Sequence, residues 1–495
     1  MNKHQPIAAR LARAGALSLT TLALLSACGG GGTSASGTSI TPITAAVSED
    51  GTVGTISGFG SVIVNGVRYD DSAATVKDDF GNSLTSSRLG LGMTVHLKGK
   101  SNDDGSGSAS GINVFSELQG PISALNATTG TFSLFGIAVI VDAKTVFADV
   151  AGLAALSNGN IVEIYGLRSG NIITATRIER KTPASGDVVI KLRGAITGLN
   201  TSASTFNLAG LVVSYAGLQV SPSTSSLTEG GFVAVSSNSA PTGTTLTANK
   251  VIALGAKPFS FNDNAKSEIE GIVNAYSSVS QFTVSGIIVN ASNAVFVRGT
   301  AASLANGGRV EIKGSYSNSI LQARLVKFED ALGLEDFELH GAVSSFTSLA
   351  SFVVRGIKVD ASGAGVLFER GTAANVANGR LLEVEGSMQT SASGSILKAT
   401  KVKFEDSSAS ATSSASSNNS NSNSSTAAGE FEFRGKVVSL SGNTLVVGSR
   451  TVNLASSTVF RRIARAQLVA GILLEIKGTL LASGNVDAER ISLED

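Results

Sequence analysis

Short runs of alternating apolar and polar residues cover most of the chain, and the same order of runs returns six times. Its clearest landmark is the phrase Gly-x-x-Val-Glu-Ile-x-Gly, found at residues 159–166 and 307–314. Looser copies begin at Gly92, Gly230, Gly379 and Gly471. Because side chains of a strand point alternately to opposite faces, Val310 and Ile312 would face a core and Glu311 would face outward. A phrase repeated in this way predicts a series of similar small β domains.

Each unit opens with a strand and continues into a tight hairpin. The opening strands carry Gly-x-Ile or Gly-x-Val and begin at Gly54, Gly120, Gly194, Gly271, Gly341 and Gly435. Two apolar runs then flank a turn, as at Ser285-Gly286 within residues 282–289. Glycine supplies the positive φ that such turns need, and Asn65-Gly66 is the strongest form of the signal. A variable stretch, the phrase with the glutamate and a final strand led by alanine complete the unit.

Five strands in an open sheet would leave two long edges, and closing the sheet removes them. We therefore expect an all-β protein, a tandem array of six small five- to six-stranded barrels resembling the oligonucleotide/oligosaccharide-binding fold. A solenoid with one coil per repeat is the alternative. It is less favoured because each unit carries several hairpin signals rather than one strand and a turn.

The recurring phrase and two low-complexity stretches divide the chain. The predicted parts are a signal peptide (1–27), a tether (28–50), repeats at 51–117, 118–182, 188–255, 266–330 and 335–406, a Ser/Asn-rich linker (407–429) and a last repeat at 430–495. The tether and linker contain too little apolar surface to order themselves. Repeats four and five are the most alike, and repeat three diverges most, with Ala234 in the glutamate position.

The first segment has the pattern of a secretory signal. A basic start precedes an apolar run at residues 14–25, which is shorter than the roughly 20 residues that span a bilayer. Leu25-Ser26-Ala27-Cys28 then resembles the bacterial lipoprotein cleavage box. The resemblance implies that Cys28 becomes the new N-terminus and carries diacylglycerol and an acyl chain such as palmitate, enough for stable anchoring. Gly29, by resemblance to sorting rules in Gram-negative bacteria, favours the outer membrane; a plain signal peptide with an incidental cysteine is the alternative.

Composition narrows the classes of partner. Charged residues are 15% of the chain, against about a quarter in typical proteins, so Ser, Thr, Asn and Gly must cover much of the surface. Without Lys3, Arg10 and Arg13 of the signal segment, 35 basic residues face 37 acidic ones, a charge of −2. A nearly neutral surface argues against binding nucleic acid or anionic lipid head groups by charge.

Few residues are candidates for chemistry. Metal sites need clustered ligands, yet only His96 and His340 remain after the signal segment, in different repeats. We find no nucleophile elbow and no phosphate loop, so we expect neither an enzyme nor a cofactor. The sharpest recurring polar feature is a glutamate column: Glu163, Glu311, Glu383 and Glu475, with His96 and Ala234 as exceptions. We predict that the column faces outward and keeps the strands soluble; a cation or ligand contact on a barrel face is the alternative.

The order of these motifs resembles a family of proteobacterial lipoproteins that carry tandem copies of a domain of unknown function. Its pattern is Gly-x-Val, Phe-x-Val-x-Gly-x-x-Val, Gly-x-x-Val-Glu-Val-x-Gly and Ala-x-x-Ile, and the resemblance covers about residues 50–495 except the linker. Only the lipidated Cys28 carries over as a functional residue. The tether and the absence of catalytic clusters in the sequence predict a lipid-anchored envelope lipoprotein with a structural or interaction role, which presents β modules to an envelope or extracellular protein or glycan. A binding protein for an oligosaccharide, peptide or cation is the alternative.

Overall fold

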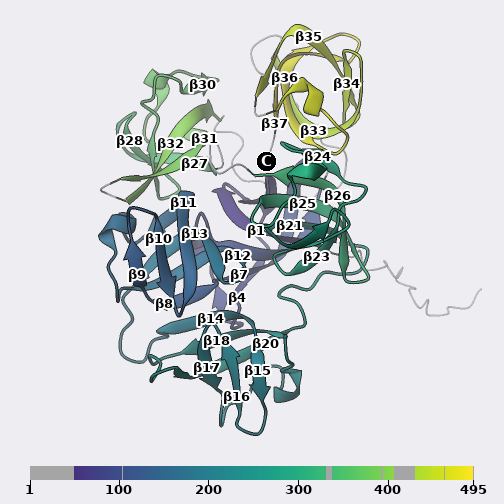
Figure 1. Ribbon diagram of the computed structural model, residues 1–495. Helices are drawn as coiled ribbons and strands as arrows, with labels where there is room; N and C mark the ends of the chain where they lie inside the picture. Colours follow the sequence, from purple (N-terminus) through teal and green to yellow (C-terminus); the bar gives the residue numbers. More distant parts are fainter. Residues whose placement is uncertain are drawn as a thin grey trace, which may run out of the picture. The chain divides into compact units, whose positions relative to one another are not determined.

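The computed structural model describes residues 49–102, 104–329, 337–391, 394–405, 430–461 and 463–493 (Figure 1). The signal peptide, Cys28, nearly all of the tether and the Ser/Asn-rich linker lie outside these residues. Strands make up 61% of the residues that the structure describes, which confirms the all-β class. The 3-10 turns that the structure describes are Ser86–Arg88, Leu153–Ala155, Thr224–Ser226, Ala301–Ser303, Ala373–Asn375 and Arg465–Gln467. Within the described ranges, no helix has the length and apolar character needed to cross a membrane.

The first three repeats contain twenty strands. Repeat one has β1 (Asp50–Phe59), β2 (Val62–Val64), β3 (Val67–Asp70), β4 (Thr75–Asp78), β5 (Ser83–Leu84), β6 (Thr94–Ser101) and β7 (Ser106–Phe115). Repeat two has β8 (Leu118–Pro121), β9 (Ser123–Asn126), β10 (Thr131–Leu134), β11 (Ile137–Ala148), β12 (Ile161–Ser169) and β13 (Ile172–Lys181). Repeat three has β14 (Ile190–Ala195), β15 (Thr197–Asn200), β16 (Thr205–Leu208), β17 (Leu211–Ser214), β18 (Phe232–Ser237), β19 (Thr245–Thr247) and β20 (Lys250–Gly255).

The last three repeats are more regular. Repeat four has β21 (Lys266–Ser278), β22 (Gln281–Val284), β23 (Ile287–Asn290), β24 (Val295–Val297), β25 (Arg309–Ser317) and β26 (Ile320–Phe328). Repeat five has β27 (Phe337–Ser348), β28 (Ser351–Val354), β29 (Ile357–Asp360), β30 (Leu367–Glu369), β31 (Leu381–Ser391) and β32 (Gly394–Phe404). Repeat six has β33 (Glu430–Ser441), β34 (Thr444–Val447), β35 (Arg450–Arg461), β36 (Leu473–Leu480) and β37 (Val486–Leu493).

Repeat four illustrates the pairing that the other repeats largely share. Its strand β21 pairs antiparallel with both β22 and β25, and β25 pairs antiparallel with β26. The strands β23 and β24 run parallel to β26. The hairpin between β22 and β23 turns at Ser285 and Gly286, whose φ angles of 49° and 75° suit a type I′ turn. Asn65 and Gly66 repeat this geometry at 50° and 74°, so the predicted hairpin turns are confirmed.

The prediction of separate barrels resembling the oligonucleotide/oligosaccharide-binding fold is wrong. Repeats one, four and five share one 19-stranded sheet, and repeats two and three share a 9-stranded sheet (Figure 1). Pairings between repeats make these sheets continuous: β1 runs parallel to β21 and β27, and β8 runs antiparallel to β14. The architecture is a β-solenoid of about 11 turns. The alternative prediction, a solenoid with one coil per repeat, gives fewer turns because the chain has six repeats. The strands of repeat six alone form a sheet that closes without a strand from another described repeat.

The physical reason for this error lies in the edges of the sheets. A repeat that closes on itself would cover the edges of its own sheet. The protein also covers its edges by pairing the first strand of one repeat with the first strand of another. Such pairs join segments more than 200 residues apart, and alternation within one repeat carries no signal for them.

Apolar residues form four clusters, and each contains residues from more than one repeat. One cluster joins repeats one and five, and a second joins repeats two and three. A third adds Val53 and Phe115 of repeat one to repeat four, and a fourth adds Val297 and Leu325 of repeat four to repeat six. Burial of this apolar surface at roughly 25 cal/mol per Å² therefore stabilises the contacts between repeats as well as the repeats themselves.

Leu118 tests whether repeats two and three are one unit. It is fully buried on β8, which pairs with both β12 and β14. We expect Leu118→Ala to cost about 2–5 kcal/mol of local stability, because it leaves a cavity in the shared core. Hydrogen exchange followed by mass spectrometry should show faster exchange in β12 and in β18 together. Ile140→Ala, at a half-exposed position of the same repeat, is the control; faster exchange confined to repeat two would contradict a shared sheet.

Candidate functional site

The glutamate column is buried, so the prediction that it faces outward into solvent is wrong. Glu163, Glu311, Glu383 and Glu475 are only 4%, 3%, 2% and 2% exposed. Alternation still holds within the strand, since Val310 and Ile312 on either side of Glu311 are fully buried in the opposite, apolar face. The face that carries the glutamates is covered by charged side chains from flanking strands and neighbouring repeats.

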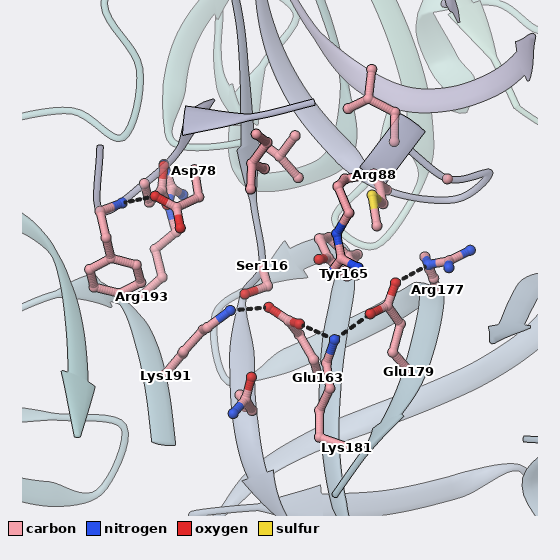
Figure 2. Close-up of a pocket in the computed structure, with 18 of the residues that line it drawn as sticks. Asp78, Arg88, Ser116, Glu163, Tyr165, Arg177, Glu179, Lys181, Lys191 and Arg193 are labelled. Carbon is pink, nitrogen blue, oxygen red and sulfur yellow. Dashed lines mark hydrogen bonds and ion pairs between the residues drawn. The ribbon is translucent and has the colours of Figure 1, made fainter. Parts of the chain in front are cut away.

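Glu163 lies at the centre of the network of repeat two (Figure 2). Lys191 on β14 and Lys181 on β13 place their Nζ atoms 2.6 and 2.9 Å from its carboxylate. Lys181 also lies 2.5 Å from Glu179, which in turn pairs with Arg177 at 2.6 Å. Burial alone would raise the pKa of Glu163, but the two ammonium groups outweigh burial and hold this pKa at about 2. The carboxylate is therefore charged at every ordinary pH.

The network of repeat four holds two carboxylates close together. Glu311 pairs with Lys313 at 2.8 Å and with Lys327 at 2.6 Å, and Glu268 pairs with Lys313 at 3.0 Å. Burial and the neighbouring charge of Glu311 raise the pKa of Glu268 to about 8, although Lys313 opposes this rise. Burial is outweighed at Glu311 by Lys313 and Lys327, which hold its pKa at about 2. The pair therefore carries one proton at neutral pH.

Glu383 is the centre of the largest network, where repeats one, five and six meet. The cations within 4 Å of its carboxylate are Lys401 (3.5 Å), Lys403 (3.6 Å), Arg68 (3.7 Å) and Arg434 (3.7 Å). Burial favours the neutral acid, but Arg68 and Lys403 outweigh it and hold the pKa of Glu383 well below its usual range. Lys401 also lies 3.7 Å from Glu475, so these two members of the column belong to one network.

Glu338, His340 and Glu383 have the one arrangement of ligand atoms in the described residues that resembles a metal site. The donor atoms lie within 4.8 Å of one another. However, Arg68 pairs with Glu338 and also lies 3.7 Å from Glu383, and Lys403 lies 3.6 Å from Glu383. A divalent ion would meet these positive charges at short range. The three residues therefore form part of an ion-pair network, and the donor set does not fit a metal.

His96 takes the column position in repeat one and has a different environment. Its ring meets those of Phe259 and Phe261 edge to face, with centroids 5.5 Å apart in both pairs. Its Nε2 is buried with no hydrogen-bond partner among the residues that the structure describes. Burial, aided by Lys98 and Arg193, lowers the pKa of His96 to about 4, so the ring is neutral. The two histidines are thus not brought together.

A polar pocket of about 540 Å³ opens among repeats one, two and three, above the Glu163 network (Figure 2). Its cationic lining residues are Arg88, Arg177, Lys181, Lys191 and Arg193. Its acidic lining residues are Asp78, Asp79, Asp149, Glu163 and Glu179. Tyr165 on β12 and Ala234 on β18 also line the pocket. Ala234 occupies the column position of repeat three, and Glu163 occupies that of repeat two.

The cations of these networks were missed by sequence reasoning, although a signal for them exists. On the last strand of repeat two, Arg177, Glu179 and Lys181 alternate with core-facing residues. Lys401 and Lys403 do the same on β32. A row of charges opposite an apolar row indicates a charged face, and both signs within one row indicate mutual pairing.

Glu163→Gln tests the role of the column. The change leaves Lys181 and Lys191 without their shared anion in a half-buried position. We expect the free energy of unfolding to fall by about 2–4 kcal/mol. This is somewhat less than the usual cost of breaking a buried ion pair, because both lysines are partly exposed and can be hydrated. Urea unfolding followed by circular dichroism measures this loss. Glu489→Gln, at an exposed position of β37, is the matched control, and equal stability of the two variants would contradict a structural role for Glu163.

Glu268→Gln tests the shared proton of repeat four. The folded protein raises the pKa of Glu268 from 4.5 to about 8, so its contribution to stability is complete below pH 4.5 and is lost as pH rises through 8. Glutamine mimics the neutral acid. The variant should match the wild type at pH 5 and exceed its unfolding free energy by roughly 2–4 kcal/mol at pH 9. Urea unfolding at both pH values measures the difference; a variant that is less stable at pH 9 would show that the ionised form is the preferred one.

Comparison with known proteins identifies the repeats. Residues 50–113, 119–179, 270–327, 340–403 and 434–492 match a family model described as Domain of unknown function (DUF5666). The five segments cover more than half of the chain. The divergent repeat three lies outside them. No curated protein matches the chain.

Proposed function

This chain belongs to the family with the domain of unknown function DUF5666, and on that premise we propose that it is a lipid-anchored lipoprotein of the bacterial cell envelope. The observation that carries the proposal is the box Leu25-Ser26-Ala27-Cys28 at the end of the apolar run. Cleavage before Cys28 would leave a lipidated N-terminus followed by a Gly- and Ser-rich tether. The resemblance to proteobacterial lipoproteins and the residue Gly29 favour the outer membrane.

The role of the folded part is structural or interactive. The proposal is supported by ion pairs and hydrogen bonds that link different repeats: Arg68 with Glu338, Arg434 with Glu383, Arg193 with Asp79, and the backbone N–H of Thr55 with Glu270. Each buried pair needs its partner in one geometry, because an unpaired buried charge costs several kcal/mol. Repeats joined in this way would hold their outer surfaces at fixed positions, which suits a scaffold that presents contacts to an envelope or extracellular protein or glycan.

The perturbed carboxylates support a scaffold better than an enzyme. Glu163, Glu311 and Glu383 are each held by two or more cations, so their charge serves the networks. A general acid or base needs a pKa near the working pH and access to substrate. Glu268 has a pKa of about 8, but it is buried and paired with Lys313 in the network of repeat four. The near-neutral charge of the mature chain also gives no support to a nucleic-acid partner.

Lipidation and location test the proposal directly. The full-length protein is produced in a Gram-negative host with an alkyne analogue of palmitate, beside Cys28→Ser as the matched control. We expect the wild type to incorporate the label and to fractionate with the outer membrane, and the variant to lose both properties. Protease treatment of intact cells then distinguishes a surface location from a periplasmic one. A wild type found soluble in the periplasm with unmodified Cys28 would refute the proposal.

A further inference from the structure

The column positions of repeats two and three both line one pocket, repeat two with Glu163 and repeat three with the short side chain of Ala234. In repeats four and five the column glutamate pairs with two lysines of its own repeat, Glu311 with Lys313 and Lys327 and Glu383 with Lys401 and Lys403. In repeat three the short Ala234 side chain lines the pocket of about 540 Å³ instead. This volume lies within the range of roughly 300–1,000 Å³ that small-molecule sites occupy.

Most charged groups in the pocket already have partners. Glu163 binds Lys181 and Lys191, and Asp79 binds Arg193 at 2.8 Å. These pairs neutralise one another and leave a wall that offers hydrogen bonds without a strong net charge. A ligand is therefore recognised by the groups that remain unpaired.

Arg88 and Tyr165 are the donors among those groups, and the exposed carboxylate of Asp149, which also has no ion pair or hydrogen bond to another described residue, is an acceptor that a ligand hydroxyl can reach. The Arg88 side chain makes no ion pair or hydrogen bond with any other described residue, and Figure 2 shows its guanidinium beside Tyr165. Tyr165 is only 6% exposed, and across the described ranges its hydroxyl has no hydrogen-bond partner. The Tyr165 oxygen is not one of the fully enclosed side-chain atoms that lack a partner, so it is reached from the pocket and its proton is available to an acceptor atom of a ligand. Burial, together with Glu163 and Glu179, raises the pKa of Tyr165 well above its usual value, so the hydroxyl keeps its proton and donates.

The hydrogen-bond donors of Arg88 and Tyr165 favour a ligand with an acceptor group. The other residues that line the pocket determine which class of acceptor fits. A guanidinium binds a carboxylate through two parallel hydrogen bonds, and a phenol can donate a third. The Ser116 hydroxyl and the Glu163–Lys191 pair lie across the pocket and can exchange hydrogen bonds with hydroxyl groups (Figure 2). Inorganic phosphate is far smaller than the space, and its higher charge would meet Glu179 and Asp149.

We propose that this pocket binds a sugar acid, a hydroxyl-rich carboxylate of monosaccharide to disaccharide size. Its carboxylate lies on Arg88 and Tyr165, and its hydroxyl groups face Ser116 and the Glu163–Lys191 pair. The lining residues come from repeats one, two and three, so the bound ligand stabilises their mutual arrangement.

Isothermal titration of the purified full-length protein with D-glucuronate tests this inference, with D-glucose and inorganic phosphate as comparison ligands. We expect glucuronate to bind at least about tenfold more tightly than either, because only glucuronate offers both a carboxylate and hydroxyl groups. Arg88→Gln and Tyr165→Phe should each weaken glucuronate binding by about tenfold or more while circular dichroism and the melting temperature stay unchanged. Ala234→Phe should abolish binding by filling the pocket.

Arg180→Gln is the matched control, since Arg180 is exposed on the neighbouring strand β13 and does not line the pocket. It should bind glucuronate as the wild type does. Three results would overturn the inference: no binding of glucuronate, equal binding of glucose, or unchanged affinity in Arg88→Gln and Tyr165→Phe. Phosphate that binds as tightly as glucuronate and competes with it would show a general anion site and would also overturn it.

Discussion

Buried ion pairs between the glutamate column and the lysines and arginines around it are the interaction on which the arrangement of the repeats depends. Removing both charges from water is costly, and their attraction offsets the cost only when every partner is in place. Glu383 draws Arg68 from repeat one, Lys401 and Lys403 from repeat five and Arg434 from repeat six. The buried charge of Glu383 therefore permits only one packing arrangement of these three repeats. The apolar clusters that the repeats share supply the favourable free energy of their contact.

This constraint also explains the composition. Only 15% of the chain is charged, yet many of these residues are buried or half-buried in networks. The solvent-facing surface is correspondingly left to Ser, Thr, Asn and Gly, which suits strands and turns. Many of the few charged residues of this protein lie in contacts between repeats. The low charge content therefore does not mean that electrostatic interactions are unimportant for the fold.

The sequence allowed a good prediction of each repeat and a poor one of how repeats meet. Turn chemistry placed the hairpin at Asn65-Gly66, and alternation placed Val310 and Ile312 in a core. The same alternation assigned Glu311 to the opposite face, but it cannot say what covers that face. Lys313 and Lys327 of the same repeat, together with strands of other repeats, cover the face that carries Glu311. Strand pairings such as that of β1 with β21 join segments that are far apart in the sequence. Local periodicity contains no information about such contacts.

The exceptions in the column are as informative as its members. His96 replaces an ion pair with a neutral ring packed on Phe259 and Phe261, and Ala234 replaces it with open space. Both changes lie in repeats one and three, which together with repeat two surround the pocket. The sequence pattern common to all repeats reflects the residues that every repeat needs in order to pack. It therefore carries no information about a feature that only one repeat has. At His96 aromatic packing takes the place of the ion pairs, and at Ala234 a short side chain takes their place in the wall of a pocket that also holds the unpaired donors Arg88 and Tyr165.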